Sequence, residues 1–91
     1  MAKFITDERF RNIFRKWCKK NPVLINQFET RLKLLEEDPF NPLLKTHPLS
    51  YSLKGLWAIR ISYEQRLIFQ FLDEAHQKIL LVTLGSHEEV Y

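Results

Sequence analysis

The sequence contains only one cysteine, Cys18, among its 91 residues. A single cysteine excludes a disulfide within the chain, and we interpret this as typical of a protein from a reducing compartment. No stretch reaches the roughly 18 apolar residues that a membrane span requires, and the first residues lack the apolar core of a secretion signal. No cysteines, histidines or carboxylates recur at the spacing of metal ligands. The sequence therefore predicts a cytoplasmic protein that binds no membrane, no metal and no cofactor.

The composition predicts one folded domain that covers residues 1–91. Hydrophobic residues make up 45% of the chain, which argues against disorder. The formal net charge is +3 and the isoelectric point is about 9.2. This mild positive bias is compatible with a polyanionic partner such as RNA and equally with an acidic protein partner.

Two helices are predicted in the first half of the chain, after a short strand over residues 3–5. Thr6 is the expected N-cap of the first helix, because carboxylates follow it in the first turn. Asn21-Pro22 separates the helices, with the asparagine as cap and the proline at the first helical position. The short connection predicts an antiparallel hairpin. Apolar residues recur at helical spacing in both segments: Phe10, Ile13, Phe14, Trp17, Ile25, Phe28, Leu32 and Leu35.

The second half of the chain predicts a loop over residues 38–50 and then four strands. The first is short, over residues 51–53. Residues 56–62 alternate, with Trp57, Ile59 and Ile61 on one face and Ala58, Arg60 and Ser62 on the other. Residues 66–72 and 78–84 are apolar on both faces, which predicts central strands, and we interpret His76 in the turn between them as solvated.

These elements predict an α+β fold with the order β-α-α-β-β-β-β. Short turns favour antiparallel pairing of the last strands. The expected architecture is a two-helix antiparallel hairpin packed on one face of a twisted, mainly antiparallel sheet of four to five strands.

Polar residues at the strand ends suit the cleavage of a phosphodiester without a metal. Imidazoles move protons and guanidiniums hold a phosphate. The two arginines flank a short connection, which for a three-residue loop puts Ser62 opposite Arg66 with Arg60 diagonal to it. Two neighbouring guanidiniums form either a phosphate clamp or a salt bridge with Glu64 or Glu88. The candidate residues are His47, Arg60, Arg66, His87 and Tyr91, with Glu64 and Lys54 as supporting residues.

The same residues carry a resemblance to a known family. Residues 55–69, GLWAIRISYEQRLIF, resemble the corresponding stretch of YoeB-type toxins. His47-Pro48-Leu49 and Gly85-Ser86-His87 resemble YafQ-type toxins. Both groups belong to the RelE/ParE superfamily of type II toxin–antitoxin systems. The resemblance implies a RelE-like domain that acts as a ribosome-dependent mRNA endonuclease, cleaves mRNA in the 30S A site and is silenced by a cognate antitoxin protein.

The resemblance also implies roles for individual residues. His47 matches a histidine in YafQ-type toxins and a glutamate in YoeB-type toxins, both proposed as the general base. Arg66 matches a catalytic arginine, His87 a C-terminal histidine proposed as general acid, and Tyr91 a terminal aromatic. Arg60 stands where YafQ-type toxins have a histidine, and the lysine cluster of RelE is not reproduced. The general base is therefore open between His47 and Glu64.

Two other functions of the same fold are considered. A ParE-like member inhibits DNA gyrase without nuclease chemistry, and the paired histidines argue against this alternative. A non-catalytic module that only binds an antitoxin is the other alternative, and the complete polar set argues against it. The expected reaction is attack of a 2′-hydroxyl on its own 3′-phosphate, with proton transfer by the histidines and charge stabilisation by the arginines.

Overall fold

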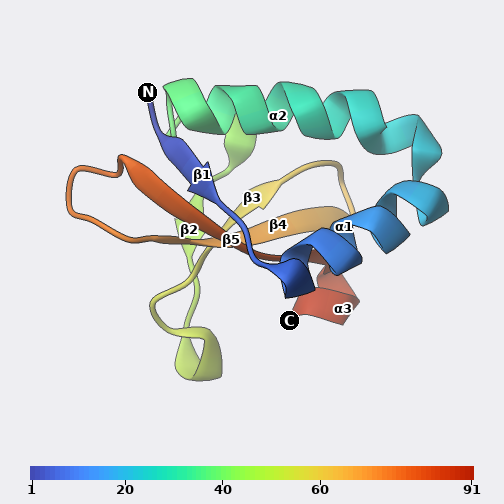
Figure 1. The fold of residues 1–91 in the computed structure, drawn as a ribbon. Coiled ribbons are helices and arrows are strands. Elements are labelled where there is room, and N and C mark those ends of the chain that lie inside the picture. The colour runs from blue at the N-terminus through green and yellow to red at the C-terminus, as the bar shows by residue number, and fades with distance from the viewer.

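The computed structural model describes residues 1–91, and its elements follow the predicted order with several short additions (Figure 1). No helix combines the length and the apolar character that crossing a membrane requires. The elements are β1 (Lys3–Ile5), α1 (Glu8–Lys20), η1 (Pro22–Leu24), α2 (Ile25–Glu37), η2 (Pro42–Leu44), β2 (His47–Pro48), η3 (Tyr51–Leu53), β3 (Trp57–Arg60), β4 (Gln65–Phe71), β5 (Lys78–Ser86) and α3 (His87–Val90), where η denotes a 3₁₀ turn.

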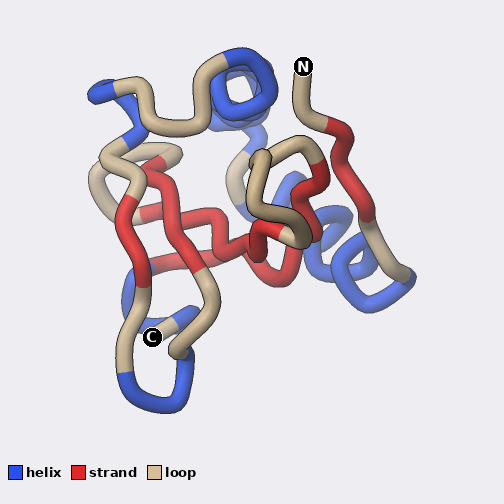
Figure 2. The backbone as a smooth tube through the Cα atoms, turned by 90° about the vertical axis from the view of Figure 1, so that its left-hand side faces the viewer, coloured by secondary structure: helices blue, strands red, loops and turns tan.

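The five strands form one mixed sheet in the order β1-β5-β4-β3-β2. All neighbouring strands are antiparallel except β1, which pairs with β5 in parallel. Figure 2 shows the strands as one layer with the helices to its sides. The predicted sheet of four to five mainly antiparallel strands is confirmed, and so is the central position of the two apolar strands, β4 and β5.

The strands present alternate residues to opposite faces of the sheet. Ile59 pairs with Leu67, and both belong to the hydrophobic core under the helices. Their neighbours Arg60 and Arg66 pair with each other and therefore lie on the opposite face, as the alternation of residues 56–62 predicted. A β-bulge lies on β5, because Ile68 and Phe69 are adjacent on β4 whereas their partners Thr83 and Leu81 are separated by one residue.

The N-terminal caps of both helices differ from the prediction, whereas both helices end where the sequence predicted, before Asn21 and before Asp38. Thr6 is not the N-cap of α1. Asp7 takes that place, and its side chain accepts a hydrogen bond of 2.8 Å from the backbone N–H of Phe10. Asn21 does not cap the second helix, because its side-chain amide donates to the Trp17 carbonyl of the helix that precedes it. Pro22 starts the 3₁₀ turn η1, and α2 begins three residues later.

Aromatic side chains join the two helices to each other and to the sheet. The Phe28 ring of α2 lies 5.0 Å from Phe14 and 5.5 Å from Trp17 of α1, measured between ring centroids. The indole N–H of Trp17 donates a 2.8 Å hydrogen bond to the side-chain oxygen of Gln65 on β4. Figure 1 shows α2 returning against the direction of α1, which confirms the predicted hairpin.

The segment between α2 and β3 departs from the sequence-based expectation in two places. Residues 51–53 are not a strand but the 3₁₀ turn η3, with Tyr51 in the left-handed region at φ 57°. The predicted loop over residues 38–50 contains the two-residue strand β2, which pairs with β3 at the edge of the sheet. His76 is not solvated, because its half-buried ring lies 4.1 Å from that of Phe71.

Phe28→Ala is expected to lower the free energy of unfolding by about 3–5 kcal/mol, because it removes a buried ring from the junction of the two helices. Urea denaturation followed by circular dichroism measures this loss. Val23→Ala, at a side chain that is 89% exposed, is the matched control and is expected to change stability by less than about 0.5 kcal/mol. Equal stability of Phe28→Ala and wild-type protein would contradict this account of the core.

Candidate functional site

The candidate site lies on the face of the sheet opposite the core. Residues that pair directly in antiparallel strands point to the same face. Arg60 pairs with Arg66, Arg66 with Gly85, and His47 pairs with Ala58, two residues before Arg60. The register therefore puts one histidine and two arginines, which lie far apart in the sequence, side by side on neighbouring strands.

Arg66 is the one charged residue that is buried, with 9% of it exposed, although it lies outside the hydrophobic core. Its Nη1 donates to the carbonyl oxygens of Ser62 and Tyr63 at 2.9 Å and to that of Gln65 at 3.2 Å. Ser62 and Tyr63 belong to the turn between β3 and β4, and Gln65 is the first residue of β4. The guanidinium thus holds this turn, and no buried polar side-chain atom is left without a partner.

Arg60 makes no hydrogen bond and no ion pair within the protein. The expected diagonal arrangement is wrong, because Arg60 lies directly opposite Arg66 and the turn pairs Ser62 with Gln65 instead. The alternative of a salt bridge with Glu64 or Glu88 is also wrong, since the one ion pair of the structure joins Lys20 and Glu89 at 3.7 Å. Two like charges at directly opposed positions repel, and a bound anion relieves the repulsion.

The last residues form the helical turn α3, which directly follows the internal strand β5. Ser86 and Glu89 form a capping box, with the Ser86 N–H donating to the Glu89 carboxylate at 2.9 Å. Hydrogen bonds from the Ser86 backbone and then its side chain hold the pKa of Glu89 below its ordinary value. A Cβ at Gly85 would lie 3.3 Å from Glu89 and Val90, so the close return of α3 favours glycine there.

The turn of α3 brings His87 and Tyr91 to the arginines. The His87 N–H donates to the Glu64 carbonyl at 2.8 Å, which links α3 to the β3–β4 turn. The rings of His87 and Tyr91 meet edge to face with centroids 4.4 Å apart. The Tyr91 hydroxyl lies 3.4 Å from Nε2 of His47. Residues from β2 and α3 therefore meet over the arginine pair.

The hydrogen bonds of His47 assign its tautomer. Its Nδ1 lies 2.8 Å from the Lys45 carbonyl oxygen, and a carbonyl only accepts, so Nδ1 carries the proton. The lone pair of a neutral His47 is then on Nε2, on the side of Tyr91. Burial raises the pKa of the Tyr91 phenol, although the nearby Arg66 charge opposes the shift. The phenol is therefore neutral at ordinary pH and has a proton to donate toward Nε2.

Two cavities meet at Arg60, Arg66 and His87, which line both of them. The smaller, of about 160 Å³, is also lined by Lys45, His47 and Tyr91. The larger, of about 490 Å³, is also lined by Tyr63, Glu64, Ser86 and Glu88. The predicted set His47, Arg60, Glu64, Arg66, His87 and Tyr91 is thus brought together around these two cavities.

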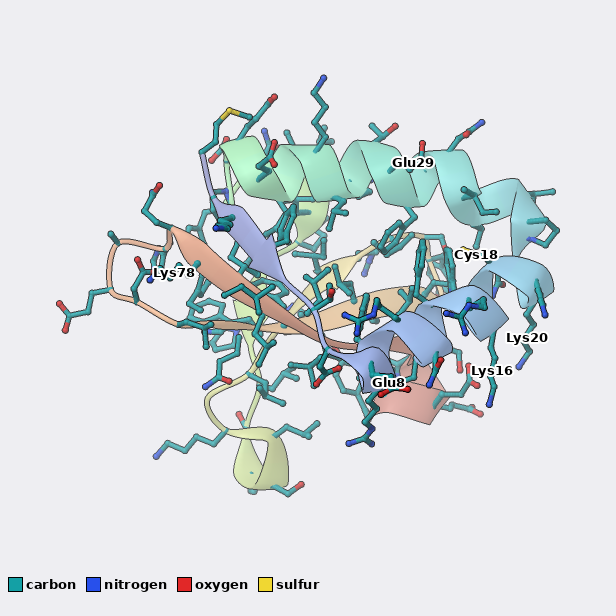
Figure 3. All side chains as sticks on the ribbon, in the orientation of Figure 1. Glu8, Lys16, Cys18, Lys20, Glu29 and Lys78 are labelled. Atoms are coloured by element: carbon teal, nitrogen blue, oxygen red, sulfur yellow. The ribbon has the colours of Figure 1, made fainter.

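Lys54 is the predicted residue that lines neither cavity. It follows η3 in the loop that projects from the sheet in Figure 1. Lys45 supplies the cation that sequence reasoning missed, and its nearness to His47 in the chain was the available signal. Lys16 and Lys20 leave α1 on the side where α3 lies, as Figure 3 shows, and they line neither cavity. No three histidine, cysteine or carboxylate side chains gather closely enough to hold a metal ion.

Comparisons with known proteins agree on the kind of protein that this chain resembles. A family model described as a YoeB-like toxin of bacterial type II toxin-antitoxin systems matches residues 6–87. Toxin YoeB of Synechocystis sp. is 29% identical over 72 residues, which are 78% of this chain and 80% of the relative.

Solved structures show the same fold. The crystal structure of YafQ from E. coli strain BL21(DE3) aligns with a TM-score of 0.80 at 19% identity and covers 100% of this chain and 99% of that one. YafQ in the E. coli DinJ-YafQ complex aligns with a TM-score of 0.78 at 19% identity, with the same coverage. Because both identities are below 25%, these two structures are evidence of the fold only. They confirm the predicted α+β architecture.

The phenol of Tyr91 is expected to ionise above the ordinary tyrosine value of about 10, because burial disfavours the phenolate more than Arg66 favours it. The tyrosinate absorbance of the wild-type protein, minus that of Tyr91→Phe, isolates this titration from those of Tyr51 and Tyr63. Because 43% of Tyr91 is exposed, its burial is partial, and a difference curve with its midpoint at or below 10 would show that this partial burial does not raise the pKa of the phenol.

Proposed function

This chain belongs to the family of YoeB-like toxins of bacterial type II toxin–antitoxin systems, as its resemblance predicted, and on that premise we propose that it is a ribosome-dependent endonuclease of mRNA. The observation that carries the proposal is the pair of guanidiniums, Arg60 and Arg66, which have no carboxylate partner and line one cavity together with the imidazoles of His47 and His87. A phosphodiester supplies the missing anion. The scissile phosphate then sits where the two cavities meet.

The mRNA itself supplies the nucleophile in the proposed reaction. The 2′-hydroxyl attacks its own 3′-phosphate, the bond from phosphorus to the 5′-oxygen of the next nucleotide breaks, and the products carry a 2′,3′-cyclic phosphate and a 5′-hydroxyl. One base takes the 2′ proton and one acid gives a proton to the leaving oxygen. Each role has a side chain in the site, so the scheme uses no metal ion and no cofactor.

His47 is the proposed general base, and Tyr91 positions it. Because the Lys45 carbonyl occupies Nδ1, the lone pair of Nε2 is available to the 2′-hydroxyl. The neutral Tyr91 hydroxyl lies 3.4 Å from that nitrogen and restrains the ring until the substrate enters. Glu64 lines the larger cavity rather than the smaller one, which makes it the weaker candidate for the same role.

His87 is the proposed general acid, and the arginines stabilise the transition state. His87 lines both cavities beside the arginine pair, whereas His47 lines only the smaller one, and this difference assigns His87 to the leaving oxygen in the proposed scheme. The Nη1 atom of Arg66 is held by backbone carbonyls, so the guanidinium meets the substrate already oriented. Preorganised charge of this kind acts most strongly on the phosphorane, which carries more negative charge than the ground state.

The proposed partners are mRNA in the 30S A site and a cognate antitoxin, in the cytoplasm. A crystal structure of the E. coli DinJ-YafQ toxin-antitoxin complex is similar to this chain in fold, which supports an antitoxin partner by analogy. Six exposed cations on α1 favour contact with RNA backbone phosphates on the ribosome: Arg9, Arg11, Arg15, Lys16, Lys19 and Lys20. Lys54, on its projecting loop, is proposed to contribute a minor phosphate contact.

Purified protein is expected to cut mRNA on translating ribosomes, and His87→Ala is expected to slow single-turnover cleavage by about 10²–10⁴-fold, the usual effect of losing a positioned acid. Mapping of the mRNA ends by primer extension measures both. His76→Ala is the matched histidine control outside the site and is expected to cleave at the wild-type rate. Growth arrest with intact mRNA and inhibited DNA supercoiling would point instead to a ParE-like gyrase inhibitor.

The choice of general base predicts unequal effects at two positions. His47→Gln is expected to lower the single-turnover rate by about 10²–10⁴-fold at saturating toxin, because it removes the proton acceptor. Glu64→Gln is expected to cost less than tenfold, because its carboxylate lies across the arginines from the attacking hydroxyl. Ribosome binding, measured by co-sedimentation, is expected to stay unchanged in both. The reverse order of effects would assign the base to Glu64.

A further inference from the structure

The two cavities that meet at the arginine pair differ in charge and in size. The smaller one adds Lys45 and no carboxylate to the shared arginines, so it is strongly cationic. The larger one adds the carboxylates of Glu64 and Glu88, whose formal charges balance the two arginines. At about 490 Å³ it lies within the range of about 300–1,000 Å³ typical of small-ligand pockets, and the smaller one lies below that range.

The presence of two carboxylates next to a proposed phosphate site requires an explanation. They repel phosphate, and neither Glu64 nor Glu88 forms an ion pair that would neutralise it. An unpaired carboxylate does accept hydrogen bonds, and nucleic-acid bases carry N–H donors on their pairing edges. The larger cavity therefore suits an uncharged group with N–H donors better than it suits a second phosphate.

Tyr63 is the one hydrophobic side chain that lines the larger cavity, and 83% of it is exposed. Nothing in the protein covers its ring, yet its backbone is fixed, because the Tyr63 carbonyl accepts from the guanidinium of Arg66 at 2.9 Å. An uncovered aromatic ring on a restrained backbone, next to two guanidiniums, suits the stacking of an unpaired base.

We propose that the larger cavity binds the base on the 3′ side of the scissile phosphate, with Tyr63 as its stacking platform and Glu88 as the acceptor that reads its pairing edge. This inference rests on the proposed function for its direction. His47 faces the 2′-hydroxyl of the 5′ nucleotide, and His87 faces the leaving 5′-oxygen of the 3′ nucleotide. The larger cavity is lined by His87 and not by His47, so the 3′ nucleotide enters it.

The carboxylate sets the preferred base. Guanine presents adjacent ring and amino N–H donors to one carboxylate, whereas uracil presents a single N–H between two carbonyl oxygens that a carboxylate repels. The site therefore favours guanine and disfavours uracil, while stacking on Tyr63 is indifferent to the base. Tyr63 acts on affinity for every nucleotide and Glu88 on the choice among them.

The test is titration of the four nucleoside 5′-monophosphates into the purified protein, followed by NMR chemical shifts. Wild-type protein is expected to bind guanosine 5′-monophosphate about tenfold more tightly than uridine 5′-monophosphate. Tyr63→Ala is expected to weaken all four about tenfold, and Tyr63→Phe is expected to keep wild-type affinity. Glu88→Gln is expected to remove the guanine preference. Tyr51→Ala and Glu74→Gln, at exposed positions that line neither cavity, are the matched controls.

The outcomes separate this inference from the proposed function. Wild-type affinity in Tyr63→Ala, equal loss in Tyr63→Phe and Tyr63→Ala, or an intact guanine preference in Glu88→Gln would each overturn the inference. Failure of wild-type protein to bind any nucleotide would do the same. Absence of mRNA cleavage on ribosomes would overturn the proposed function, whereas cleavage with unaltered nucleotide binding in Tyr63→Ala would overturn only the base site.

Discussion

The guanidinium of Arg66 is the contact on which the rest of the site depends. A buried cation needs partners, and here they are the backbone carbonyls of the β3–β4 turn. The same turn offers the Glu64 carbonyl to the first N–H of α3, so the terminal helix rests on a loop that Arg66 holds in place. Loss of this side chain therefore loosens the support of His87 and Tyr91, in addition to removing the phosphate ligand of the proposed reaction. All three bonds come from Nη1, so a lysine preserves the charge but has no second nitrogen to offer an anion while the first holds the carbonyls.

Much of the architecture was predictable, because it follows from local chemistry and from periodicity. Apolar spacing identified both helices and the central strands, and the alternation of residues 56–62 correctly separated Ile59 from Arg60. The errors occur where two local signals compete. Asp7 replaced Thr6 as the N-cap, since a carboxylate caps as well as a hydroxyl. Residues 51–53 looked like a strand, yet Tyr51 adopts a left-handed conformation that only the folded chain reveals.

The candidate residues were predictable as a set, but not their arrangement. Pairing of Arg60 with Arg66 depends on the register of a hairpin whose turn is held by the arginine itself. Tyr63 was missed because an exposed tyrosine carries no signal until the cavities are known, and Lys45 was missed although it lies two residues before His47 in the chain. The capping box of Ser86 and Glu89 was readable in the sequence as a helix start. The apolar run before it instead favoured a strand over residues 78–84 with no helix after it.

In the proposed function, the two adjoining cavities allow a chain with a net charge of only +3 to bind an RNA strand in one direction along its backbone. Uniform positive charge would bind RNA in any register, because phosphates repeat along the strand. Here the cationic cavity and the carboxylate-lined cavity share Arg60 and Arg66, so a phosphate on the arginines puts one neighbouring nucleotide toward His47 and the other toward Glu88. Reversal of the strand would bring the wrong oxygen to each histidine. In the proposed complex, the difference in charge between the two cavities thus sets the direction in which the strand binds, which the two arginines alone cannot do.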